Sequence, residues 1–269
     1  MKNLLSILSI IFILSFFTTV AYSQDSPAVG YTQFMAVDYS APNIVYSATL
    51  GQGLLKSTDY GESWNLICSQ ADKNEFHVIK VDPKNSSRLF AGGSRSGLLL
   101  STDKGISWKQ IGLKDVSICD IAIDETNPVR IFVLANEGVY SNENIEKNEW
   151  KLSFDYIKYV AEFTKTKLPT IDKSDTTRRG RRGNRALWSY SRFQKIAVSP
   201  HNPNTIIVAA RWEGGYHRSD DGGKTWRHET LSGIYRRVDV IYFHPKDPNI
   251  ICVGTHHQGL FKTFNNIRA

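Results

Sequence analysis

The stretch Ser219-Asp220-Asp221-Gly222-Gly223-Lys224-Thr225-Trp226 decides the fold, because the chain repeats its pattern. Ser57-Thr58-Asp59-Tyr60-Gly61-Glu62-Ser63-Trp64 and Ser101-Thr102-Asp103-Lys104-Gly105-Ile106-Ser107-Trp108 share the form Ser-x-Asp-x-Gly-x-(Ser/Thr)-Trp. The Asp carboxylate can accept hydrogen bonds from backbone N–H groups of its own loop, and the Gly tolerates a positive φ. The Trp buries a large ring against a neighbouring repeat. Each copy is therefore expected to end a structural hairpin rather than to bind a ligand.

This pattern resembles the Asp-box (BNR) repeat of sialidase-like, sortilin-like and xyloglucanase-like β-propellers. The positions that carry the resemblance are Ser57, Asp59, Gly61, Trp64, Ser101, Asp103, Gly105, Trp108, Ser219, Asp221, Gly223 and Trp226. The resemblance implies an architecture of repeated blades. It implies no particular activity, because the Arg-Ile-Pro segment of sialidases does not occur and the catalytic aspartates of xyloglucanases cannot be placed on this sequence.

Aligning the chain on these boxes shows a unit of about 44 residues, the interval from Asp59 to Asp103. A Gly stands six residues before each box Asp, and Gly138 and Gly259 keep that offset to Asn144 and Asn265, which indicates two degenerate copies. Each unit also contains a Pro/Asn turn between two β-branched or aromatic runs. Four strands per unit predict an all-β propeller of four-stranded blades with five blades visible.

Ring closure is left open by the sequence. The fifth unit ends at Phe264-Asn265-Asn266-Ile267-Arg268-Ala269 without an outer strand. Either Asp25 to Gln33 supplies that strand and closes a five-bladed ring, or the chain is a fragment of a larger propeller.

The first 23 residues read as a secretory signal. Lys2 provides the positive start, an apolar run extends from Leu4 to Phe17, and Ala21-Tyr22-Ser23 is a small-x-small cleavage site. The apolar run is too short for a membrane span, so no transmembrane segment is expected after signal removal. The chain beyond it, residues 24–269, is predicted to be one propeller domain that is secreted or held in the periplasm or cell envelope.

The composition shows a moderate positive charge and few cysteines. The formal net charge is +7 over 269 residues, and +6 without Lys2. Three scattered cysteines, Cys68, Cys119 and Cys252, do not form a disulfide framework and lie in strand-like contexts. They are interpreted as small hydrophobic residues, with one disulfide plus a free thiol as the alternative.

The interval between Trp150 and Trp226 is 76 residues, which leaves room for an irregular basic insertion at about 155–192. Its arginines, Arg178, Arg179, Arg181, Arg182 and Arg185, would not pack in a core. The insertion is either a solvated loop or a basic flap for an anionic glycan, cell-surface polymer or acidic protein. Nucleic acid is not an expected partner, since the chain is exported and contains no nucleic-acid-binding motif.

Loops that connect the second and third strands of each blade (the b–c loops) should gather at one end of the propeller. They contribute Arg95, Arg211, Trp212, His256 and His257 as candidate ligand-binding residues. Glu137 and Glu213 are the candidates for an acid–base pair, since a sugar site needs an aromatic platform and carboxylates. Adjacent histidines without a third ligand predict no metal site, and no cofactor motif occurs.

The sequence supports three hypotheses for the function. The first is binding of an extracellular glycan or protein on the b–c loop face. The second is glycoside hydrolysis of an extracellular polysaccharide, xyloglucanase-like rather than sialidase-like. The third is an assembly or scaffold role.

Overall fold

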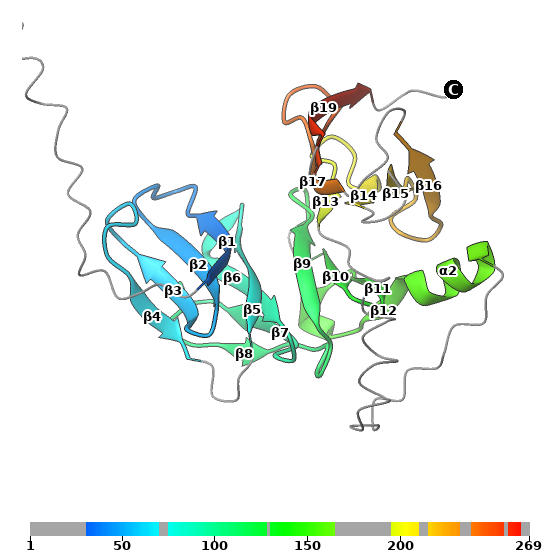
Figure 1. The fold of residues 1–269 in the computed structure, drawn as a ribbon. Helices are drawn as coiled ribbons and strands as arrows, with labels where there is room; N and C mark the ends of the chain where they lie inside the picture. Colours follow the sequence, from blue (N-terminus) through cyan, green and yellow to red (C-terminus); the bar gives the residue numbers. More distant parts are fainter. Residues whose placement is uncertain are drawn as a thin grey trace, which may run out of the picture.

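The computed structural model describes residues 31–69, 75–127, 130–164, 195–209, 215–231, 238–255 and 258–264. Within these ranges the chain forms five antiparallel sheets (Figure 1). The first four sheets each have four strands, and three strands of the fifth lie in the described residues. The prediction of an all-β chain of four-stranded propeller blades is confirmed.

Strands follow one another along the chain within every sheet. The first sheet contains β1 (Tyr31–Val37), β2 (Val45–Leu50), β3 (Gly53–Ser57) and β4 (Asn65–Cys68). The second contains β5 (Phe76–Asp82), β6 (Asn85–Gly93), β7 (Leu98–Ser101) and β8 (Lys109–Gln110). The third contains β9 (Ile118–Ile123), β10 (Ile131–Ala135), β11 (Gly138–Asn142) and β12 (Lys151–Asp155), with the short 3-10 helix η1 (Ile145–Lys147) before β12.

The remaining two sheets come from the C-terminal part of the chain. The fourth contains β13 (Ile196–Val198), β14 (Ile206–Ala209), β15 (Gly215–Ser219) and β16 (Arg227–Thr230). The fifth contains β17 (Val238–Phe243), β18 (Ile250–Thr255) and β19 (Gly259–Phe264).

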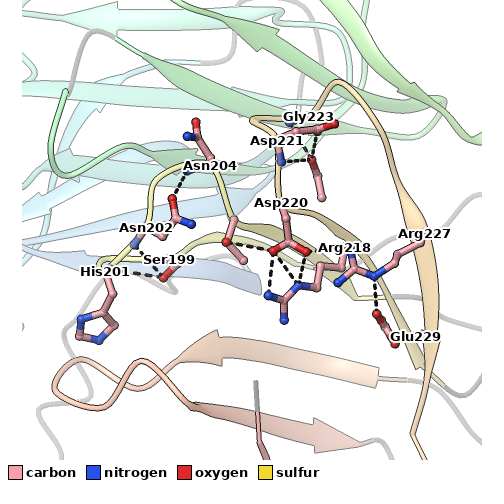
Figure 2. Close-up of polar contacts among 12 residues, drawn as sticks. Ser199, His201, Asn202, Asn204, Arg218, Asp220, Asp221, Gly223, Arg227 and Glu229 are labelled. Carbon is pink, nitrogen blue, oxygen red and sulfur yellow. Dashed lines mark hydrogen bonds and ion pairs between the residues drawn. The ribbon is translucent and has the colours of Figure 1, made fainter. Parts of the chain in front are cut away.

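The three boxes adopt the same hydrogen-bonded hairpin end. In each, the Ser hydroxyl lies 2.6–2.8 Å from the box carboxylate and accepts the backbone N–H of the box Gly at 2.8 Å. The carboxylate also accepts the N–H four residues later at 2.9 Å. These box glycines have φ near +90°, a conformation that side chains disfavour. Figure 2 shows the box carboxylate of Asp221 beside Gly223 in the fourth sheet.

The turns between the first and second strands of each sheet share a second hydrogen-bonding pattern. Asp38, Asp82 and Asp124 each accept the N–H two residues later at 2.8 Å. Ser199 and His244 do the same at 3.3 Å in the fourth and fifth sheets. These side chains accept N–H groups that have no ladder partner in the turn, which is why a polar residue stands at this position.

The core consists of four apolar clusters, each between consecutive sheets. Tyr46 and Leu54 of the first sheet pack with Ile79 and Leu89 of the second. The other three clusters join the second sheet to the third, the third to the fourth, and the fourth to the fifth. Burial between stacked sheets is therefore the main source of stability.

Consecutive sheets are joined by extensive contacts of their innermost strands. Among the described residues, no contact of that extent joins the fifth sheet to the first. Figure 1 draws the first sheet (blue) and the fifth (orange to red) apart from each other. The structure thus shows a stack of five propeller sheets.

Two segments singled out in the sequence are described in part. Tyr31 and Thr32 pair with Leu50 and Thr49, so this part of the Asp25–Gln33 segment lies in the first sheet and supplies no strand to the fifth. The beginning of the predicted irregular insertion is the helix α2 (Tyr156–Thr164). Its two-turn length is too short for a clear 3.6-residue period in the sequence. The other insertion residues, including the five arginines, lie outside the described residues.

Candidate functional site

The b–c loops and the connections between sheets lie at the same end of the stack. The Ser94 N–H donates to the Glu75 carbonyl at 2.8 Å, and the Tyr156 N–H donates to the Glu137 carbonyl at 3.0 Å. Each bond joins a b–c loop to a segment that links one sheet to the next. We call this end of the second and third sheets the b–c loop face.

Two predicted site residues lie on the described part of this face. Arg95 is exposed in the loop between β6 and β7, and Glu137 is half-buried in the loop between β10 and β11. The structure therefore places them on consecutive sheets. The other predicted residues lie outside the described ranges, namely Arg211, Trp212, Glu213, His256 and His257.

Glu137 is oriented by a neighbouring phenol. The Tyr140 hydroxyl donates to Glu137 Oε1 at 3.1 Å. Burial, followed by the charge of Glu137, raises the pKa of Tyr140, so the phenol stays protonated and remains a donor. The Tyr140 hydroxyl thus holds the carboxylate in place, as a binding or acid–base group requires.

A serine and a histidine form a pair on the same face. His77 Nδ1 lies 2.9 Å from the Ile118 carbonyl oxygen, which can only accept, so Nδ1 carries a proton. In the neutral ring Nε2 is then an acceptor, and it lies 3.1 Å from Ser94 Oγ. Glu75 Oε2 lies 3.4 Å from the same Ser94 hydroxyl. Both imidazole nitrogens are thus engaged within the protein, and the cluster presents a hydroxyl oxygen and a carboxylate to a ligand.

This cluster was missed in the sequence. The one available signal was the closeness of Glu75, which directly precedes β5, to His77 two residues later on that strand. Ser94 lies in the loop after β6, the strand that pairs with β5, and nothing in its local sequence marks it as a partner of His77.

A second cluster lies deeper, on the innermost strands. Asp120 of β9 is buried, and Lys80 Nζ and Lys195 Nζ lie 3.4 and 3.7 Å from its carboxylate oxygens. The Ile196 N–H donates to Asp120 Oδ2 at 3.2 Å. Both ammonium groups stand over the ring of Phe34, at 4.3 and 4.0 Å from its centroid. One residue from each of the first four sheets therefore meets in a single charged cluster.

The cluster sets two ammonium groups against the one carboxylate of Asp120. Burial lowers the pKa of Lys195, and the neighbouring Asp120 carboxylate opposes that shift. Cation–π contacts of both lysines with Phe34 add attraction. The cluster is best described as an electrostatic tie between four sheets beneath the b–c loop face.

The opposite end of the fourth sheet carries an arginine network (Figure 2). Asp220 accepts from Arg218 Nε at 2.9 Å and pairs with Arg227 Nη1 at 2.7 Å. Arg227 Nε in turn contacts Glu229 at 2.6 Å. Burial alone would raise the pKa of Asp220, but the arginine contacts outweigh it and lower that pKa. These groups neutralise one another, so the network is structural.

Metal-binding geometry is not found among the described residues, where no group of three or more His, Cys, Asp or Glu side chains could hold an ion. The three cysteines occur as half-buried thiols. Among the residues that the structure describes, no helix is long and apolar enough to cross a membrane.

Comparison with known proteins supports the repeat assignment. The family model of the BNR/Asp-box repeat matches residues 217–228, the third box. A curated relative from Neosartorya fischeri, described as a probable oligoxyloglucan-reducing end-specific xyloglucanase, is 23% identical over 215 residues. That alignment covers 72% of this chain and 26% of the relative.

Among solved structures, an ancestral GH74 enzyme superposes with a TM-score of 0.60 at 16% sequence identity. The match covers 87% of this chain and 31% of the enzyme. The chain thus spans a third or less of the length of these two proteins. The likeness establishes the Asp-box propeller fold, and the relatives' activities are properties of the larger proteins.

Proposed function

We propose that this Asp-box propeller binds a neutral extracellular glycan of the xyloglucan type on its b–c loop face. The proposal rests on two groups of side chains that lie on the b–c loop face of consecutive sheets. One is the Glu137 carboxylate, which Tyr140 orients. The other is the cluster of Ser94, His77 and Glu75. The distant relative described as a xyloglucanase supplies the ligand class.

Sugar hydroxyls both donate and accept hydrogen bonds, so they are recognised by mixed polar groups rather than by a single charge. Glu137, fixed by Tyr140, can accept from a pair of hydroxyls. Ser94 donates to His77, so its oxygen offers a further acceptor, and the exposed guanidinium of Arg95 supplies the donors. The predicted aromatic platform, Trp212, completes this proposal as a stacking residue.

A second candidate function is glycoside hydrolysis, favoured by the curated relative's description as a xyloglucanase. Hydrolysis needs two carboxyl groups across the scissile bond, separated by roughly 5–10 Å. Under this hypothesis Glu137 and Glu213 are the pair. We also propose export of the chain, on the basis of the signal-like first 23 residues.

Binding can be tested by titration calorimetry of xyloglucan oligosaccharides into the chain from Gln24. We expect Glu137→Gln and Ser94→Ala each to weaken binding by roughly tenfold, the value of about one hydrogen bond to a charged or oriented group. Glu62→Gln is the matched control, because Glu62 is an exposed carboxylate in the first box, at the other end of its sheet. A folded wild-type chain that binds no such oligosaccharide would overturn the proposal.

The same samples separate binding from hydrolysis. If the chain is a hydrolase, reducing ends appear with the wild type and vanish with Glu137→Gln, while binding is only weakened. Turnover retained in Glu137→Gln excludes Glu137 as acid or base. Binding without any release of reducing ends supports the binding function alone.

A further inference from the structure

The contact between Ser94 and His77 begins with an irregularity in the inner strand of the second sheet. The pairing of β5 with β6 skips one residue between Phe76 and Val78, so His77 is the extra residue of a β-bulge. A bulge bends its strand and re-aims the side chains beside it, and bulges are frequent next to active sites. From this position the His77 ring contacts both the b–c loop of its own sheet and the Ile118 carbonyl of the third sheet.

The third sheet repeats this arrangement with other residues. Cys119 is the extra residue of the corresponding bulge in β9, and its thiol lies 3.3 Å from Asn136 Oδ1. Asn136, like Ser94, lies in the b–c loop and donates its N–H to the segment before the inner strand. The repeat therefore brings these two positions together whatever residues occupy them. In the second sheet the residue types make the contact one between a hydroxyl and an imidazole.

A glycine fixes the position of Ser94. At Gly93, the residue before it, a Cβ would overlap the Glu75 carbonyl oxygen, so the end of β6 lies this close to the start of β5 only with glycine there. The Ser94 N–H donates to that same carbonyl at 2.8 Å. Further along the loop, the Gln110 side chain donates to the Ser96 carbonyl at 2.9 Å. The loop is thus held by bonds within the protein, which gives Ser94 the fixed position that a reacting group needs.

His77 is held in the tautomer of a general base. Its Nδ1–H is donated to the Ile118 carbonyl, so Nε2 accepts the hydrogen bond of Ser94 Oγ at 3.1 Å. A nucleophile, a base that takes its proton and a third group that orients the base are the parts of nucleophilic catalysis by serine. Glu75 Oε2 lies 3.9 Å from Nε2, where its negative charge favours the imidazolium that forms when His77 takes a proton. Both Ser94 and His77 are partly exposed, so a substrate can reach them.

We propose that Ser94 is the nucleophile and His77 the general base of an acyl-transfer site whose substrate is a carboxylic ester. Ser94 Oγ attacks the ester carbonyl carbon as its proton passes to His77 Nε2. The bond from that carbon to the alcohol oxygen then breaks, and the alcohol leaves with the proton from His77. A water molecule, deprotonated by His77 in turn, attacks the acyl-serine, which releases the carboxylic acid and restores the Ser94 hydroxyl.

Arg95 supplies the positive group that this step needs. Negative charge develops on the carbonyl oxygen during the attack, and it is stabilised by donors placed beside the nucleophile. The N–H of the residue after the nucleophile is one such donor in α/β-hydrolases, and Arg95 holds that place after Ser94. Its side chain is exposed and makes no ion pair among the residues that the structure describes. We assign Arg95 to stabilisation of the oxyanion.

Two measurements on the purified chain test this proposal. One is hydrolysis of p-nitrophenyl acetate. The other is labelling by a fluorophosphonate, which reacts with activated serine hydroxyls, with the labelled residue located by peptide mass spectrometry. We expect the label on Ser94. Ser94→Ala should remove the label and reduce hydrolysis to the rate without protein, and His77→Gln should slow both reactions by on the order of a hundredfold or more, the contribution of a positioned general base.

Two control variants remove the same groups elsewhere. Ser69→Ala removes an exposed hydroxyl at the same end of the first sheet, and His201→Gln removes an exposed imidazole in the turn between β13 and β14. Neither should change hydrolysis or labelling. Thermal melts show whether the variants fold. If His77→Gln does not fold, the label on the wild-type chain still decides, because an ordinary serine hydroxyl does not react with the fluorophosphonate.

A wild-type chain without a label on Ser94 overturns the proposal, as does hydrolysis that Ser94→Ala retains. Neither reagent contains a sugar, so both results are independent of glycan binding. A chain that binds xyloglucan oligosaccharides but is not labelled contradicts acyl transfer alone. A labelled chain that binds no such oligosaccharide supports acyl transfer and contradicts only the proposed glycan binding.

Discussion

The indole of Trp226 packs on the phenyl ring of Phe154, with the two ring centroids 5.2 Å apart and the planes inclined by 33°. Trp226 ends the third box, in the fourth sheet, whereas Phe154 lies on the outermost strand of the third. The Trp226 indole N–H meanwhile donates to the carbonyl of Gly223 in its own box. One side chain thus closes its local hairpin and joins two sheets.

Trp226→Ala should destabilise the fold by about 2–4 kcal/mol. The substitution leaves a cavity beside Phe154 and removes the aromatic contact, and the cost is below that of a fully buried tryptophan because Trp226 is only partly buried. Urea unfolding followed by circular dichroism measures this loss. Trp64→Ala is the matched comparison, since Trp64 makes the same box bond to Gly61 but packs on none of the four clusters of the described residues. Equal losses in the two variants would show that the sheet–sheet contact contributes nothing.

Two glycines in one loop allow backbone strain to be separated from crowding. Gly51 and Gly53 have φ of +96° and +102°. A Cβ at Gly51 would meet nothing within 4 Å, whereas at Gly53 it would fall 2.1 Å from the Cys68 carbonyl oxygen. We expect Gly51→Ala to cost about 1–2 kcal/mol of stability from strain alone. Gly53→Ala should cost clearly more, because β3 and β4 must separate. Thermal melts of both variants decide whether the order holds.

The box carboxylates should make stability fall in acid. Hydrogen bonds from Ser57 and then Ser63 lower the pKa of Asp59 to about 2, and contacts with Ser107 do the same for Asp103. An ordinary Asp has a pKa of about 3.9 when unfolded. Because the folded pKa is the lower one, this stabilisation is fully present above about pH 4 and is lost as pH falls toward 2. The urea midpoint of Asp103→Asn should therefore depend less on pH in that window than the wild-type midpoint. Parallel profiles would contradict the prediction.

Removing the carboxylate of Asp120 should destabilise the inner strands. Asp120→Ala leaves Lys80 and Lys195 facing each other over Phe34, and leaves the Ile196 N–H without its acceptor. We expect a loss of about 2–4 kcal/mol in the free energy of unfolding. Asp120→Asn retains an acceptor and should lose less. If both variants unfold at the wild-type urea concentration, the cluster does not hold the four sheets together.

Local features of this protein could be predicted from its sequence. Ser57, Asp59, Gly61 and Trp64 interact within eight residues, so the box hairpin depends on the identity and spacing of near neighbours. The strands around each box, their order and the number of repeats followed from the same spacing. The candidate site was predicted less completely, as Arg95 and Glu137 are on the b–c loop face, but the Ser94–His77 pair and the Asp120 cluster were not foreseen.

Tertiary structure alone decided which side chains meet and which are covered. Four separate repeats contribute Phe34, Lys80, Asp120 and Lys195. Only the stacking of the sheets brings these four side chains together. Leu54 and Leu260 look alike in sequence, each following the glycine that opens a third strand. Leu54 is buried because a second sheet lies against it, and Leu260 is exposed because none of the described sheets does. The repeat determines the shape of a sheet, while burial depends on the neighbour against which that sheet is stacked.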